Sequence, residues 1–299
     1  MSLVAYSTPQ KAYDALVAAF KQSPAGTKAS FQESFGASGA QSRAVAAGQP
    51  ADVVAFSLEP DISKLVKAGL VPSSWNQNAH HGMVTDSVVT LVVRKGNPKN
   101  IHSWDDLVQP GIKVVTPNVF SSGSAKWNLM AAYGAQVKAG KSPADALAFV
   151  NELLKHTVTQ PDSGSKATAA FVGGVGDVLI SYENEAIQAK SSGAAIDYVT
   201  PDRTILIENP IAVTTHAKNP TLAKAFVDFL YTDAAQKVFA AHGYRPVVAA
   251  DLDATQFPAP AQLFTIADLG GWSTVNTQFF DPTTGSISKI ENSLGVSGG

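Results

Sequence analysis

Short hydrophobic runs alternate with amphipathic stretches along the N-terminal part of the chain. The run Leu3–Tyr6 has the length of a strand, and the apolar residues after it recur at the spacing of one buried helical face: Tyr13, Leu16, Val17 and Phe20. The same alternation predicts two more strand–helix units: Ala29–Phe35 with Ser38–Ala47, and Asp52–Phe56 with Asp61–Ala68. Repeated units of this kind predict a mostly parallel sheet with helices on both faces.

A second region with the same alternation begins near Ser87. The region opens with the apolar segment Ser87–Val93, and further strands are predicted at Lys113–Thr116, around Val158, and over Val178–Ser181 and Ile196–Val199. Helices are predicted over Ser124–Lys138 and Pro143–His156, and after Ser165 and Glu183. The remainder returns to amphipathic helices, of which the first has an apolar stripe: Leu222, Phe226, Phe229 and Leu230. Both regions therefore indicate an α/β fold.

Length and composition narrow the possible functions. The chain has 299 residues, which suffices for about two domains of ordinary size. Charged residues make up 15% and the net charge is −2, so no basic excess is available to bind nucleic acid. There is no cysteine, which excludes disulfides, thiolate metal ligands and a cysteine nucleophile. The longest apolar stretches have the length of strands, so no transmembrane helix is expected.

Small polar residues stand just before several predicted helices. Three serine–glycine clusters occupy Gly36–Gly39, Ser121–Ser124 and Asp162–Ser165, while Ser7-Thr8 precedes the first helix, with Pro9 at its first position. Helix capping alone would explain any one cluster. A glycine beside a cap also lets a ligand approach the backbone, and the N–H groups of a helix N-terminus bind anions. We call such a helix N-terminus, with the small polar residues before it, the head of the helix. Four heads in two regions predict one anion bound by neutral donors from both regions.

Catalytic motifs are absent or incomplete. The sequence has no P-loop, no G-x-G-x-x-G after a strand and no G-x-S-x-G. Ser163–Lys166 matches S-x-x-K, but the S-D-N and K-T-G motifs that accompany it are missing. Glu183 and Glu185 are expected to diverge at a helix start, which makes a poor acid–base pair. The six histidines form no H-E-x-x-H, and His80 and His81 are adjacent, so we expect neither a metal site nor a cofactor.

Two aromatic residues differ in their expected roles. Trp127 lies on the apolar stripe of its helix and is expected in the core. Tyr182 follows the strand Val178–Ser181 at its carboxyl end, where open α/β sheets bind ligands. Its hydroxyl can donate a hydrogen bond there, although a purely structural role is an equal alternative.

The chain contains several motifs that are long rather than generic: Leu91–Leu107, Thr116–Asn118, Ser121–Gly123, Trp127-Asn128, Gly176–Ile180, Glu183–Ala186, Tyr244–Pro246 and Leu263–Ile266. In these motifs the chain resembles the periplasmic sulfate-binding proteins of bacterial ABC importers. The resemblance runs from about Tyr6 to Ile290. The resemblance implies a two-lobe, class II solute-binding fold. In that family a sulfate dianion is buried between the lobes, bound by backbone N–H groups, one serine hydroxyl and one tryptophan indole.

The resemblance implies a ligand role for seven residues: Ser7, Ser38, Ser122, Gly123, Ser124, Ser165 and Tyr182. Ser122 matches the hydroxyl donor, and the other serines and the glycine match backbone N–H donors. Three of these serines depart from the family pattern. Ser7 stands in place of an aspartate, Ser124 in place of a glycine and Ser165 in place of an alanine. Backbone donors survive such replacements, although the surroundings of the first one change.

Three further departures concern side chains. Tyr182 replaces the tryptophan, which is the largest change in the implied site. Lys126 and Lys166 replace arginines on the first turns of their helices, where they keep the charge but lose the fork geometry of a guanidinium. We expect both lysines to support the site rather than to bind the anion.

The implied architecture has lobe one over residues 1–86 and 208–299 and lobe two over residues 87–207, with the ligand cleft between them. The hinge is expected in the crossing segments near Ser87–Val89 and Ile205–Ile211. The implied function is not enzymatic. A monomeric protein of the periplasm or cell envelope captures sulfate and delivers it to a membrane permease, whose separate ATPase supplies the energy. The start of the chain lacks signal-peptide features, which fits either a cytosolic protein or a mature exported form.

Three alternatives stay open at this point. The anion is a related oxyanion, namely thiosulfate, molybdate or tungstate; or the protein is a transferase or an S-x-x-K hydrolase; or it is an interaction module without a small ligand. The four helix heads disfavour an interaction module without a small ligand. A measurement of enzymatic turnover decides whether the protein is a transferase or hydrolase.

Overall fold

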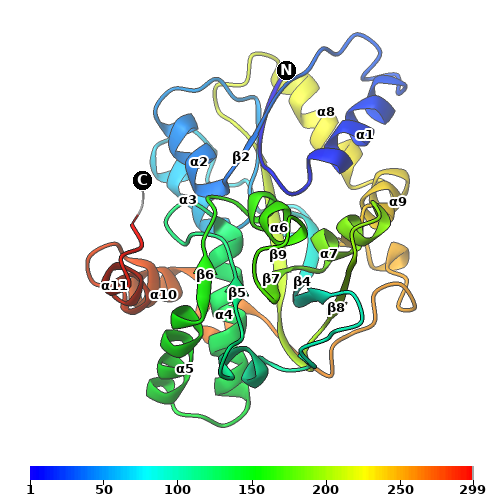
Figure 1. The fold of residues 1–299 in the computed structure, drawn as a ribbon. Helices are drawn as coiled ribbons and strands as arrows, with labels where there is room; N and C mark the ends of the chain where they lie inside the picture. Colours follow the sequence, from blue (N-terminus) through cyan, green and yellow to red (C-terminus); the bar gives the residue numbers. More distant parts are fainter. Residues whose placement is uncertain (298–299) are drawn as a thin grey trace. The chain divides into compact units, whose positions relative to one another are not determined.

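The computed structural model describes residues 1–297, whose contacts divide the chain into two compact units. Unit 1 comprises Met1–Asp86 and Glu208–Phe257, and unit 2 comprises Ser87–Ile207 and the residues from Pro258 onward. Each unit is an α/β body with helices packed on a sheet (Figure 1). The α/β fold with flanking helices is therefore confirmed.

The sheet of unit 1 has the strand order β2–β1–β3–β9. Its strands are β1 (Ser2–Tyr6), β2 (Gln32–Gly36), β3 (Val53–Ala55), the end of β9 (Arg203–Val213), and β10 (Arg245–Pro246) beside the start of β4 (Met83–Arg94). Its helices are α1 (Gln10–Lys21), α2 (Ser38–Ala46), α3 (Glu59–Lys67), α8 (Pro220–Leu230) and α9 (Asp233–Ala241), with a short 3-10 turn at Ala249–Asp251. β1 runs parallel to β2 and β3, and β9 runs antiparallel to β3.

In unit 2 the strands β4, β7, β5 and β6 are neighbours in that order, and β8 also pairs with β4. The strands are β5 (Val114–Val115), β6 (Thr157–Thr159), β7 (Val178–Tyr182), β8 (Ile196–Val199) and β11 (Gln262–Phe264). The helices are α4 (Gly123–Lys138), α5 (Pro143–Lys155), α6 (Gly164–Val172), α7 (Glu183–Ser191), α10 (Gly271–Val275) and α11 (Ser286–Ser293). Short 3-10 turns lie at Trp104–Val108 and Ile266–Leu269, and a π-helical turn lies at Asn276–Phe280.

Both sheets are more mixed than the sequence pattern predicts. β5 runs parallel to β6 and β7, as expected. The long strands β4 and β9, however, which carry the chain across the boundary between the units, are antiparallel to neighbours in their units. The predicted strand Lys113–Thr116 shortens to Val114–Val115, and the predicted strand Ala29–Phe35 begins only at Gln32.

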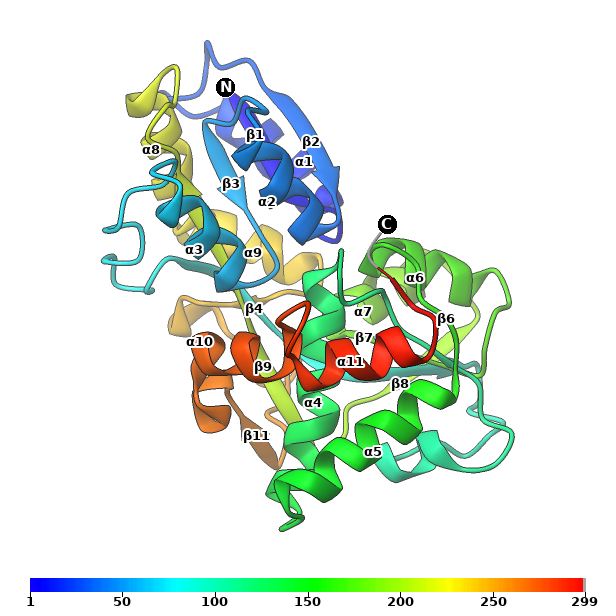
Figure 2. The ribbon, with the colours of Figure 1, turned by 90° about the vertical axis from the view of Figure 1, so that its left-hand side faces the viewer.

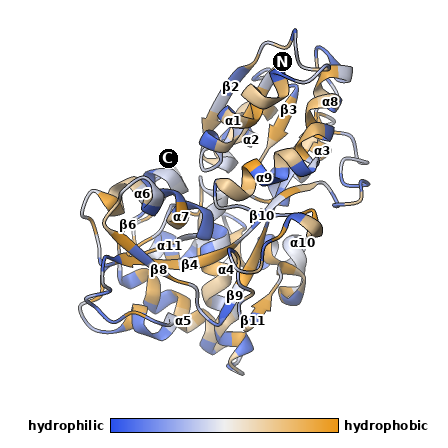
Figure 3. Cartoon of the chain, turned by 90° about the vertical axis from the view of Figure 1, so that its right-hand side faces the viewer, coloured by the Kyte–Doolittle hydropathy of each residue, from blue (hydrophilic) through white to orange (hydrophobic). Residues whose placement is uncertain are grey.

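Each unit has its own hydrophobic core. In unit 1 one cluster gathers the apolar faces of α1, α8 and α9, including the stripe predicted at Tyr13 and Phe20, and a second gathers those of α2 and α3. In unit 2 a cluster lies under α6 and α7. Figure 3 shows the hydrophobic colour along β4 and β9, whereas α5 carries both colours, as an amphipathic helix should. Within residues 1–297 no helix has both the length and the apolar composition to cross a membrane.

The C-terminal segment differs from the sequence expectation. We expected residues 208–299 in one lobe, but the contacts place the segment from Pro258 onward in unit 2, so the chain crosses the boundary three times rather than twice. The reason is packing. β11 pairs with the Arg203–Ile205 end of β9, the ring of Trp272 meets that of Trp127 at 4.6 Å, and α11 lies beside α5 (Figure 2).

Candidate anion-binding site

The head of α2 follows β2 after a single residue. Ala37 is the N-cap, and no side chain caps this helix. Ser38 is 2% exposed; its hydroxyl donates to Asp61 Oδ2 at 2.6 Å and accepts the N–H of Ser57 at 3.0 Å. The hydroxyl is therefore used inside unit 1, and the backbone N–H groups of this uncapped helix N-terminus are of the kind that can bind an anion.

The head of α1 lies at the carboxyl end of the neighbouring strand β1, where Tyr6 pairs with Gly36 of β2. The predicted hydroxyl caps are wrong here. Pro9 is the N-cap rather than the first helical residue, and no side chain caps α1. The carbonyl of Ser7 instead accepts the N–H of Gln10 at 3.3 Å. The heads of α1 and α2 thus follow the paired ends of adjacent parallel strands, as the sequence pattern predicted.

The head of α4 carries a pair of buried hydroxyls. Ser122 is the N-cap, but its side chain does not cap the helix. Its Oγ lies 2.7 Å from Oγ of Ser124, and both serines and the intervening Gly123 are buried. One hydroxyl donates to the other, so the second hydroxyl keeps its hydrogen for a further acceptor. This head combines that O–H with the N–H groups of an uncapped helix.

The head of α6 is capped by its own side chain. Ser163 Oγ accepts the N–H of Lys166 at 3.3 Å and lies 3.3 Å from Oγ of Ser165. The exposed Lys166 ammonium forms an ion pair with Asp162. A hydrogen bond from that ammonium lowers the pKa of the Asp162 carboxyl. The charge of Lys166 is therefore balanced by a carboxylate that lies just before its own helix.

The head of α7 begins where β7 ends. Tyr182 is the last residue of β7 and the N-cap of α7, is fully buried, and pairs with Val89 of β4. The next residues, Glu183 and Glu185, are buried as well. Glu185 accepts hydrogen bonds from the hydroxyls of Ser181 at 2.7 Å and Thr168 at 3.2 Å. Burial raises the pKa of Glu185 to about 7.

Hydrogen bonds connect the three heads of unit 2 with one another. The Ser121 hydroxyl, before α4, donates to the carbonyl of Asp162, before α6, at 2.8 Å. The Asn118 N–H donates to the carbonyl of Pro161, also at 2.8 Å. The bonds of Glu185 then join α6 to α7 through Thr168. Unit 2 therefore connects the heads of α4, α6 and α7 through hydrogen bonds.

Three residues that form hydrogen bonds at the heads of the two units were not predicted from the sequence. Asp61 and Thr168 lie in their helices like ordinary polar residues, and nothing in the pattern indicates their partners. Glu185 was interpreted as half of a divergent carboxylate pair, whereas it is a buried hydrogen-bond acceptor. A polar residue facing the apolar side of its helix is the one signal that could have identified it.

Lys126 contacts the C-terminal segment of unit 2. Its Nζ donates to Oδ1 of Asn276 at 3.2 Å and lies 5.1 Å from the centre of the Phe280 ring. Trp127, the next residue, is fully buried against Trp272, so its predicted place in the core is confirmed.

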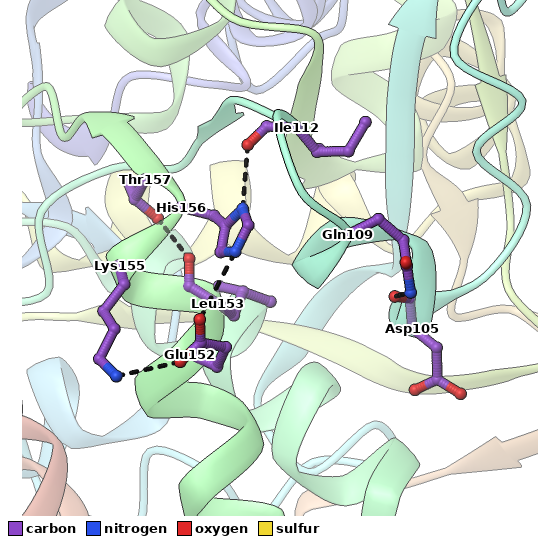
Figure 4. Close-up of polar contacts among 8 residues, drawn as sticks. All are labelled: Asp105, Gln109, Ile112, Glu152, Leu153, Lys155, His156 and Thr157. Atoms are coloured by element: carbon purple, nitrogen blue, oxygen red, sulfur yellow. Dashed lines mark hydrogen bonds and ion pairs between the residues drawn. The ribbon is translucent and has the colours of Figure 1, made fainter.

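His156 illustrates how a histidine of this chain serves local structure (Figure 4). It is the C-cap of α5, where its Nδ1 lies 3.1 Å from the carbonyl oxygen of Ile112 and its Nε2 lies 3.6 Å from Glu152. Glu152 also pairs with Lys155 at 3.0 Å. Within residues 1–297, no group of three histidine or carboxylate side chains is arranged to hold a metal ion.

Two cavities within the units lie away from these heads. One, of about 320 Å³, is in unit 1 beside Asp52 and Lys218, and the other, of about 330 Å³, is in unit 2 beside Trp104 and the C-terminal end of α4. None of the seven predicted ligand residues lines either cavity.

Comparisons with known proteins show the family to which this chain belongs. The family model described as bacterial extracellular solute-binding protein matches residues 1–245. A sulfate-binding protein of Synechococcus elongatus is 40% identical over 94% of this chain and 83% of its own length. A thiosulfate-binding protein of Escherichia coli is 33% identical over 95% of this chain and 89% of its own.

A solved structure is also similar. The sulfate-binding protein SubI from Mycobacterium tuberculosis is 51% identical and superimposes with a TM-score of 0.92, over 94% of this chain and 99% of that one. The family expected from the sequence motifs is thereby confirmed. The chain belongs to the bacterial extracellular solute-binding proteins.

Proposed function

We propose that this protein binds sulfate outside the cytoplasmic membrane and delivers it to the permease of an ABC importer. The observation that carries the proposal is the head of α4, where two buried hydroxyls share a hydrogen bond on a helix that no side chain caps. An uncapped, buried helix N-terminus with a spare O–H is suited to a fully deprotonated oxyanion. The relatives described as sulfate-binding support the choice of anion.

We propose that Ser122 donates its hydroxyl and that Gly123, Ser124 and Ser165 donate backbone N–H groups, with Tyr182 as a side-chain donor. These five residues belong to the connected heads of unit 2. As further donors we propose backbone N–H groups of unit 1, at the two heads that carry Ser7 and Ser38. Lys126 and Lys166 are bonded to Asn276 and Asp162, so they are assigned supporting roles.

Neutral donors favour sulfate over phosphate. Sulfate near neutral pH carries no proton, whereas phosphate carries one that needs an acceptor. At the α2 head, the Asp61 carboxylate already accepts the Ser38 hydroxyl. An O–H without an acceptor costs ~1–3 kcal/mol, so we expect sulfate to bind at least about tenfold more tightly than phosphate.

A calorimetric titration with sulfate, thiosulfate, phosphate and molybdate tests the proposal. We expect tight sulfate binding and weak phosphate binding. Tighter binding of thiosulfate or molybdate than of sulfate would reassign the cargo to that oxyanion, and tungstate would then be tested beside molybdate. Phosphate binding as tight as sulfate binding would contradict the donor set. Absence of binding to every anion would refute the function.

The family is one of binding proteins, and we assign no catalytic role to any residue. We further propose that the protein acts as a monomer in the periplasm or cell envelope and that its partner is a membrane permease. Sedimentation of the purified chain with and without sulfate tests the monomer, since a dimer would sediment at twice the mass.

A further inference from the structure

A buried side-chain hydrogen bond joins the head of α7 to the strand that crosses between the units. The hydroxyl of Ser87 donates to Oδ1 of Asn184 at 2.9 Å, and both residues are fully buried. Ser87 is the first residue of unit 2 on β4. Asn184 lies in the first turn of α7, two residues after Tyr182. The bond therefore connects an anion-binding head to the point where the chain enters unit 2.

The position of this bond follows from the register of the sheet. In the antiparallel pair of β4 and β7, Val89 is opposite Tyr182 and Thr90 is opposite Ser181. If the pairing continued by two more residues, Ser87 on β4 would stand opposite Asn184. The ladder has ended there because the backbone turns into α7 after Tyr182. A side-chain bond thus replaces the next rung and holds the first turn of the helix to the strand.

A second feature distinguishes Asn184 from an ordinary buried amide. Its Nδ2 is buried and has no hydrogen-bond partner among residues 1–297. Buried amide donors are nearly always paired in folded proteins. The Oδ1 bond to Ser87 fixes the plane of the amide, and so it also fixes the direction of this remaining donor at the head of α7.

We propose that Asn184 is a positioning residue of the anion site, which through Ser87 fixes the first turn of α7, with Tyr182 at its cap, to the crossover strand β4. The proposal rests on the proposed sulfate binding and goes beyond the seven ligand residues. Its physical basis is that a donor placed about 1 Å away from its ideal position loses most of a hydrogen bond to the anion.

The test combines two single variants with their double variant. Ser87→Ala and Asn184→Ala should each raise the Kd for sulfate about five- to twentyfold, the range expected when a buried polar partner is lost. The double variant should bind no more weakly than the weaker-binding single variant, because both changes break the same bond. Single variants with the parental Kd, or effects that multiply in the double variant, would overturn the proposal.

A matched control lies two residues away on the same strand. The hydroxyl of Thr85 donates to Oδ1 of Asn209 at 3.3 Å, so Thr85→Val removes an equivalent buried hydroxyl–amide bond within unit 1. We expect Thr85→Val to change the Kd less than about twofold. If Thr85→Val lost as much affinity for sulfate as Ser87→Ala, any disturbance of β4 would weaken binding, and the specific role of Asn184 would be overturned.

Hydrogen exchange of the anion-free protein provides a readout that does not depend on sulfate. Ser87→Ala and Asn184→Ala should both increase exchange at the amides of residues 186–189, the first that bond within α7, while Thr85→Val leaves them unchanged. Parental exchange in both variants would refute the positioning role. If the parent binds no anion but the exchange changes as expected, the proposed function fails while the fixing of α7 stands.

Discussion

The substitution Ser38→Ala separates the stability of unit 1 from anion binding. The Ser38 hydroxyl is buried between two partners, the Asp61 carboxylate at 2.6 Å and the Ser57 N–H at 3.0 Å. A hydrogen bond to a charged group contributes about 1.5–3 kcal/mol and a neutral one about 1 kcal/mol. Losing both should lower the free energy of unfolding by about 2–4 kcal/mol, which corresponds to a fall in Tm of about 5–10 °C.

Affinity should respond differently from stability. The hydroxyl is already used inside unit 1, and the donor proposed for the anion is the backbone of the head. We therefore expect the Kd of Ser38→Ala for sulfate to stay within about threefold of the parental value. Thermal unfolding without ligand measures the first effect and calorimetric titration at a temperature well below Tm measures the second.

Ser42→Ala is the matched control on the same helix. Ser42 is fully buried, and its hydroxyl donates to the backbone carbonyl of Asp61 at 2.8 Å, a neutral acceptor. Its loss should cost only about 1 kcal/mol. If Ser38→Ala remained folded but bound sulfate more than about tenfold weaker, with Ser42→Ala unaffected, the Ser38 hydroxyl would contact the anion and our assignment would be wrong. An unchanged Tm would contradict the role of the Asp61 bond.

Three other substitutions test separate parts of the site and fold. Gly123→Pro should abolish sulfate binding in titration while the helix content by circular dichroism stays parental, because proline is tolerated at the first position of α4 but has no N–H; retained binding would exclude that donor. Tyr182→Phe should weaken sulfate by about 1.5–3 kcal/mol, and parental affinity would remove the phenol from the site. Burial and the nearby Glu208 raise the pKa of Asp86 to about 8. Between pH 3.8 and about 8 the folded state therefore keeps a proton that the unfolded chain has already lost. The free energy of unfolding consequently falls as the pH rises through that range. Asp86→Asn should then raise Tm more at pH 8 than at pH 5, and an equal rise at both would refute the shift.

Much of each unit could be predicted from local patterns. The spacing of Tyr13, Leu16 and Phe20 reports a helix face, because residues three and four apart lie on one side of a helix. Serine and glycine before a helix indicate its N-terminus, because the N-cap position favours these residues whatever the rest of the fold is. The heads of α2, α4, α6 and α7 were therefore predicted within one or two residues.

The partners of these local features could not be predicted in the same way. Ser38 bonds to Asp61 and Ser87 to Asn184 across 23 and 97 residues, and both contacts depend on the order of strands. The C-terminal helices are amphipathic, and an apolar stripe does not specify which core it covers. That is why the segment from Pro258 onward was assigned to the wrong lobe, although its helices and the apolar rings of Trp272 and Phe279 are ordinary core-forming features.

The three crossings of the chain set an order in which the units can be completed during synthesis. Unit 1 lacks α8 and α9 until the residues up to Phe257 have left the ribosome. Unit 2 must wait longer, because β11, Trp272 and α11 are made last and cover α4 and α5. Before then the indole of Trp127 and the small face at Gly134, which Phe264 covers, remain open to other chains. Unit 2 is thus the part of a nascent chain that most needs protection from aggregation.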